Sequence, residues 1–91
     1  MTIDNFDSLE ICNLHYNITQ YILPRLKVFK ESTYSYPNSL TLRQWIGILD
    51  KMIYAFEYAS KDEIALCDSN EYKQYQEGIA LFSQYFLNLW I

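Results

Sequence analysis

Apolar residues recur along this chain at steps of three and four, and this spacing constrains the fold more than any other feature. Such steps place side chains on one face of an α-helix, whereas a half-buried β-strand requires strict alternation. Three segments carry a face of this kind, over about residues 16–32, 41–60 and 69–90. Only two glycines and two prolines occur in 91 residues, which argues against a turn-rich all-β protein. We therefore predict an all-α fold, a small bundle of three, or three to four, helices.

The first apolar face contains a proline. Its members are Leu14, Ile18, Ile22, Leu26 and Phe29. Pro24 lies inside this pattern, and two interpretations remain open. It either kinks one helix or occupies the first position of a new helix. The segment that follows contains Tyr36-Pro37-Asn38, which predicts a turn.

The second and third segments have recognisable starts. Thr41 with Gln44 three residues later is a capping-box pattern, and Asp68 with Glu71 is another. The predicted core stripe of the second segment is Trp45, Leu49, Met52, Phe56 and Ala59. The third segment has a heptad-like seam, made of Tyr72, Tyr75, Ile79, Phe82, Phe86 and Leu89. Three short helices cannot cover all of its large side chains, Tyr85 and Trp90 included, so we predict a self-association surface and a homo-oligomer.

Chain length and charge limit the possible classes of protein. Ninety-one residues suffice for one small core, so we predict a loosely ordered lead-in over residues 1–12 and one helical domain over 13–91. A net charge of −4 disfavours a free nucleic-acid-binding protein, which is normally basic. We see neither a signal peptide nor an apolar run long enough for a membrane span. We therefore expect a cytoplasmic protein with free thiols at Cys12 and Cys67.

Motifs that carry catalysis are missing. His15 is the only histidine, and no nucleophile-elbow motif surrounds any serine. Gly47 and Gly78 lie inside predicted helices rather than in a phosphate-binding loop. Each costs its helix about 1 kcal/mol relative to alanine, which predicts a close approach by another helix or by a ligand. Two cysteines and one histidine fall short of the four ligands of a structural zinc site. We predict no enzymatic activity, no cofactor and no metal site.

Polar side chains within these apolar helices are the candidate binding residues. Basic groups suit phosphates, acids suit ribose hydroxyls or an amino group, and aromatic rings stack on bases. The predicted ligand-binding residues are Arg25, Lys27, Lys30, Arg43, Asp50, Lys51, Tyr54, Glu57 and Glu77. The alternative interpretation of these positions is a solvated polar face. On one helix, Arg25 and Lys27 lie about 200° apart, so they reach one phosphate together only where Pro24 distorts the turn.

Several motifs occur together in this chain. Residues 22–30 fit ILPRLKxFK, residues 36–37 are Tyr-Pro, residues 45–57 fit WxxILDKMIxAFE, and residues 76–90 fit QEGxxLFxxYFxxLW. This set resembles a family of small proteins encoded by tailed bacteriophages, and the match covers most of the chain. The resemblance implies a phage protein that acts in the cytoplasm of an infected bacterium.

By analogy of class, the resemblance further implies an antagonist of host defence. One possible function is to sequester a nucleotide-type immune signal in a pocket of basic, acidic and aromatic residues. The alternative is to inhibit a host protein through a tyrosine-rich acidic surface. A third possibility is a structural or assembly protein of the virion. The expected partners are therefore a small nucleotide or a host protein, and neither nucleic acid nor a membrane.

Overall fold

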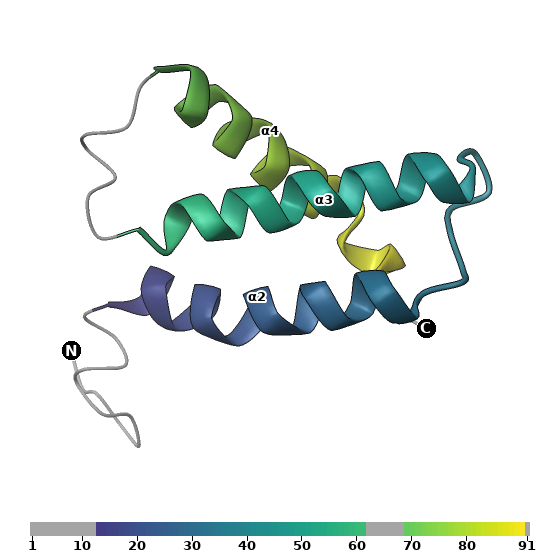
Figure 1. The fold of residues 1–91 in the computed structure, drawn as a ribbon, viewed down its shortest axis with the longest axis horizontal. Helices are drawn as coiled ribbons and strands as arrows, with labels where there is room; N and C mark the ends of the chain where they lie inside the picture. Colours follow the sequence, from purple (N-terminus) through teal and green to yellow (C-terminus); the bar gives the residue numbers. More distant parts are fainter. Residues whose placement is uncertain (1–12, 62–68, 91) are drawn as a thin grey trace.

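The part of the chain that the structure describes contains three α-helices and one short 3₁₀-helix. The structure is a computed structural model that describes residues 13–61 and 69–90. Its elements are α2 (Leu14–Ser32), α3 (Leu42–Ala59), α4 (Ser69–Gln84) and η2 (Phe86–Asn88). Within these ranges no strand is present, which confirms the predicted all-α class. Helix α3 packs against both α2 and α4, and η2 leads the chain back toward the C-terminal half of α2 (Figure 1).

Helix α3 supplies most of the core. Four residues of its predicted stripe are buried, namely Trp45, Leu49, Met52 and Phe56, while Ala59 is half-buried. The predicted capping box starts the helix. The Gln44 N–H donates to the Thr41 hydroxyl over 3.1 Å, and the Thr41 N–H donates to the Gln44 side-chain oxygen over 2.9 Å. Both the position of this helix and its buried face are thus encoded locally.

Helix α2 continues through Pro24. The helix is unbroken from Leu14 to Ser32, so the interpretation that a new helix starts at Pro24 is wrong. A proline removes one backbone hydrogen bond, and packing of the helix on its neighbours offsets that loss. Leu26 of α2 is buried in the core. By contrast, Leu14 and Ile18 are 54% and 51% exposed, so the first half of the predicted apolar face lies at the surface.

Helix α4 ends earlier than its seam predicts. The heptad-like pattern continues to Leu89, but the α-helix stops at Gln84 and the chain turns into η2. The Tyr85 ring packs edge-on against Trp45, with 5.6 Å between the ring centroids, and Leu89 packs against the core. The turn brings Leu89 inward and leaves Phe86 57% exposed. The sequence predicts that some aromatic side chains of this segment lie outside the core, and Tyr72, Phe86 and Trp90 are exposed.

The two mid-helix glycines differ in their surroundings. A Cβ on Gly78 would meet the backbone carbonyl oxygen of Lys51 and would lie 2.6 Å from the Cβ of Ala55. The predicted close helix approach is therefore confirmed at Gly78. A Cβ on Gly47 would meet nothing within 4 Å, so close helix packing does not explain that glycine.

Some sequence predictions concern residues that the structure does not describe. The lead-in over residues 1–12, the capping residue Asp68 and both cysteines, Cys12 and Cys67, lie outside the described ranges. Among the described helices, none combines the length and the apolar character that crossing a bilayer requires.

Candidate binding site

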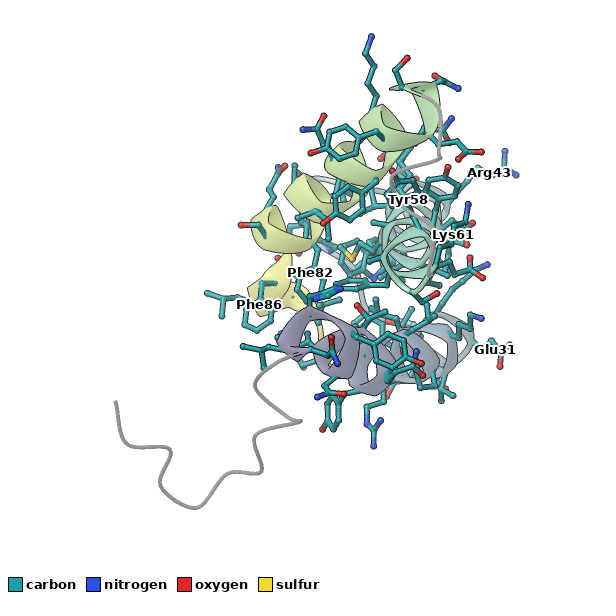
Figure 2. The ribbon with its side chains drawn as sticks, turned by 90° about the vertical axis from the view of Figure 1, so that its left-hand side faces the viewer. Glu31, Arg43, Tyr58, Lys61, Phe82 and Phe86 are labelled. Atoms are coloured by element: carbon teal, nitrogen blue, oxygen red, sulfur yellow. The ribbon has the colours of Figure 1, made fainter. Side chains whose placement is uncertain are left out.

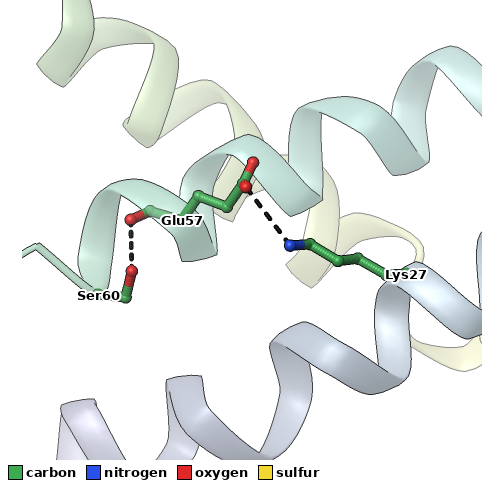
Figure 3. Close-up of polar contacts among 3 residues, drawn as sticks. All are labelled: Lys27, Glu57 and Ser60. Atoms are coloured by element: carbon green, nitrogen blue, oxygen red, sulfur yellow. Dashed lines mark hydrogen bonds and ion pairs between the residues drawn. The ribbon is translucent and has the colours of Figure 1, made fainter.

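Six of the nine predicted binding residues form ion pairs between helices. Their partners are Lys27 with Glu57, Lys30 with Asp50, and Lys51 with Glu77. Lys27 reaches from α2 to α3, where its ammonium lies 3.5 Å from the Glu57 carboxylate (Figure 3). In each pair the charges offset one another, so these lysines do not make a surface with excess positive charge. The side chains are 35–55% exposed, and such pairs contribute at most about 1 kcal/mol each.

Four of the predicted residues surround one hollow between α3 and α4. We call it the α3–α4 hollow; it measures about 260 Å³, and its lining residues are Asp50, Lys51, Tyr54, Gln74 and Glu77. Gly78 lets α4 approach the α3 backbone at Lys51, which sets Glu77 beside that lysine. The Lys51 ammonium lies 3.1 Å from the Glu77 carboxylate. The hollow therefore joins a basic, an aromatic and two acidic residues that the sequence had singled out.

Gln74 is the lining residue that the sequence analysis missed. It precedes Glu77 by three positions, so both side chains lie on the same face of α4. That spacing is the signal that would have found it once Glu77 was chosen. An amide adds one acceptor and two donor hydrogens to the hollow. The combined groups suit a neutral, polar ligand with a flat ring better than they suit a phosphate, because two of the five lining residues are acidic.

The remaining predicted residues are placed elsewhere. Arg25 lies over the ring of Tyr21 at 3.8 Å from the centroid, and its guanidinium donates to the Tyr21 carbonyl over 2.8 Å. Arg43 is exposed near the start of α3 and projects outward (Figure 2). Lys27 and Glu57 pair with each other, and neither lines the hollow. The nine residues therefore do not converge on one phosphate site.

A second concave site lies where α2, α3 and α4 meet. We call it the tyrosine pocket; it measures about 350 Å³. Its lining residues are His15, Ile18, Thr19, Phe56, Tyr58, Ala59, Tyr72, Tyr75 and Ile79. Sequence reasoning placed Tyr72 and Tyr75 in a packing seam and missed that they border a pocket. The spacing of three residues between them was the available signal, because it predicts neighbouring rings on one helix face.

Neither a metal-binding cluster among the described residues nor a match to another protein identifies the site. In the part of the chain that the structure describes, no three His, Cys, Asp or Glu side chains are grouped so that they could hold a metal ion. Comparison of the chain with protein-family models, curated proteins and solved structures gave no match. The resemblance to phage proteins therefore stays a prediction, and a function has to be argued from the geometry.

Proposed function

We propose that this chain is a non-enzymatic binding protein of a bacteriophage that sequesters a nucleotide-type signal of host defence. It acts in the cytoplasm of the infected bacterium and holds the nucleoside part of its ligand in the α3–α4 hollow. The observation that carries the proposal is the convergence of Asp50, Lys51, Tyr54 and Glu77 on this hollow. These are the residue types that recognition of a base and a ribose requires.

The chemistry of the hollow matches a nucleoside. The Tyr54 ring offers a face for a base, and its hydroxyl can donate or accept. Asp50 and Glu77 can accept hydrogen bonds from ribose hydroxyls or from an amino group. The exposed Lys51–Glu77 pair is worth at most about 1 kcal/mol, so a ligand can exchange it for its own contacts at low cost.

Thermal melting against a panel of nucleotides, cyclic dinucleotides and cyclic ADP-ribose isomers tests the proposal. A ligand that binds only the folded state adds about 2.7 kcal/mol at a hundredfold excess over Kd. In a domain of this size, that corresponds to a rise in Tm of roughly 10 °C or more. Because all lining residues of the hollow belong to this one chain, the shift should appear with the purified protein alone.

Variants then assign the site. Lys51→Ala and Glu77→Gln should abolish the ligand-induced shift while leaving the Tm of the free protein within a few degrees. Lys73→Ala is the matched control, because it removes an exposed lysine of α4 that does not line the hollow. A full shift in both hollow variants would refute the site, and a panel without any shift would refute the nucleotide ligand.

A second candidate function is inhibition of a host protein, and a separate observation favours it. Phe86, Leu87 and Trp90 are 57%, 85% and 65% exposed, and we call them the C-terminal apolar patch. Figure 2 shows Phe86 at the outer edge of the molecule, whereas Phe82 lies further inside. Large apolar side chains that are exposed within so short a stretch of chain are typical of protein-binding surfaces.

Affinity capture from host lysate tests this second function. The double variant Leu87→Ser/Trp90→Ser should lose a stoichiometric partner that the unmodified chain retains. Val28→Ser is the control, because Val28 is also an exposed apolar residue, at 61%, but lies on α2. A partner retained by the double variant, or lost equally in the control, would exclude the patch as the binding surface.

A further inference from the structure

The tyrosine pocket has apolar walls from three helices. Ile18 of α2, Phe56 of α3 and Ile79 of α4 all line it. Its volume of about 350 Å³ falls at the lower end of the range of ligand pockets, about 300–1,000 Å³. Ile18 is 51% exposed although it faces this concavity. An apolar residue in such a position gains by contact with an apolar ligand, because the contact removes its surface from water.

Three tyrosine rings give the pocket a preference for aromatic ligands. The rings of Tyr58 and Tyr75 are stacked, with centroids 5.0 Å apart and planes at 29°. The Tyr72 ring lies 5.8 Å from that of Tyr75, at 31°. Tyr58 is buried, whereas Tyr72 is 47% exposed and forms the outer member of the group. The Tyr58 and Tyr72 rings are tilted by 56° with centroids 6.4 Å apart, so the three rings form a tilted aromatic cluster rather than a parallel stack. A cluster of this kind with an accessible outer ring favours contact with another aromatic ring over an aliphatic chain.

The charges near the pocket offset each other. The Lys61 ammonium lies 5.5 Å from the centroid of the Tyr58 ring and 3.8 Å from the Glu71 carboxylate. The buried Thr19 hydroxyl donates to the backbone carbonyl of His15 over 2.8 Å, within α2. Among the described residues, the charged pair beside the pocket, Lys61 with Glu71, therefore favours neither a cation nor an anion, and a neutral ligand is the better match.

We propose that the tyrosine pocket is a second binding site, which takes a neutral planar aromatic ring such as an indole, a phenol or a nucleobase. The ring packs against Tyr72 and Tyr75 and covers Ile18 and Ile79. This inference does not rest on the proposed function, because the α3–α4 hollow is lined by a different set of residues. The same ring chemistry is available from a free small molecule or from a side chain of a peptide.

An NMR titration of the full chain tests the proposal with defined probes. Indole-3-acetamide is the neutral aromatic probe, indole-3-acetate the charged one and N-acetyl-leucinamide the aliphatic one. The amide should bind with a Kd of about 1 mM or tighter, as expected for a ligand of this size. Its binding should shift the NMR signals of Ile18 and Ile79. The other two probes should bind more weakly. A capped peptide with one central tryptophan is the fourth probe. A lower Kd for this peptide than for the amide would show that the aromatic ring comes from a peptide side chain.

Substitutions locate the binding site and define the results that would contradict the proposal. Tyr72→Ala should weaken binding of the amide roughly 5- to 150-fold, the usual effect of removing a stacking ring. Tyr75→Phe keeps the ring and should bind like the unmodified chain. Tyr34→Ala, the control, removes a 75% exposed tyrosine that does not line the pocket. No perturbation by either aromatic probe, equal binding of the aliphatic probe, or unchanged binding in Tyr72→Ala would overturn the proposal. Lys51→Ala should leave this binding intact, which separates it from a failure of the α3–α4 hollow.

Discussion

Gly78 has no side chain at a point where α4 touches the backbone of α3. A methyl group there would meet the Lys51 carbonyl oxygen, an atom that cannot rotate away. The contact also places Glu77 beside Lys51, so the packing of one glycine helps to build the α3–α4 hollow. The conformational cost of a glycine inside a helix is thus offset by packing at Gly78.

Alanine substitutions at the two glycines should have opposite effects. Gly47→Ala should raise the free energy of unfolding by up to about 1 kcal/mol, because the new methyl group meets open space and favours the helix. Gly78→Ala should lower it by about 1–3 kcal/mol, the usual cost of overpacking. Urea denaturation followed by circular dichroism measures both. A stabilised Gly78→Ala would mean that α4 does not approach α3 as closely as described, and a destabilised Gly47→Ala would point to an unseen contact at that surface.

At the residue scale, the sequence predicted which residues line a site better than it predicted which residues they contact. It singled out Asp50, Lys51, Tyr54 and Glu77, and these do share one hollow. It also singled out Arg25, which instead covers the ring of Tyr21 on its own helix. A side chain's type shows what it can bind, but the helix that faces it depends on packing between segments far apart in the chain. No local pattern contains that information.

Among the elements, α2 departs most from what its sequence favours. Pro24 interrupts its hydrogen bonding, yet the helix continues from Leu14 to Ser32. Pro24 is exposed, and two positions later Leu26 is buried in the core. Tertiary packing therefore holds a helix that local propensity would break.

Replacing Pro24 by alanine should stabilise the chain. The substitution restores an N–H group that can donate to the carbonyl four residues earlier, and it removes a helix-interior penalty of about 3 kcal/mol. Greater freedom of the unfolded chain offsets up to about 1 kcal/mol of this gain. We expect a higher urea midpoint with an unchanged m-value. A lower midpoint would show that the proline ring itself contributes contacts that alanine cannot replace.

The helices themselves were predictable because each carries its own signals. The capping box at Thr41 and the stripe from Trp45 to Phe56 define α3 without reference to the rest of the chain. The end of α4 was not predictable in the same way. A seven-residue pattern continues past Gln84, but the edge contact between Tyr85 and Trp45 is made across the fold. The periodicity of apolar residues predicts which face of a helix is buried. Where the helix ends depends on contacts with the rest of the fold.

For the whole molecule, the C-terminal apolar patch is the surface that the predicted homo-oligomer would use. A symmetric dimer needs one self-complementary surface, and specific interfaces bury about 1,200–2,000 Å² in total. Phe86, Leu87 and Trp90 provide large, exposed apolar side chains close together in the sequence.

Sedimentation equilibrium of the purified chain tests this oligomer. The average mass should rise with concentration from that of one chain toward two or more, because association follows mass action. Leu87→Ser/Trp90→Ser should keep the mass of one chain throughout, since it removes the two most exposed members of the patch, whereas Val28→Ser should behave like the unmodified chain. A monomer at every concentration would leave the patch to a different protein, and an oligomer that survives the double substitution would place the interface elsewhere on the helices.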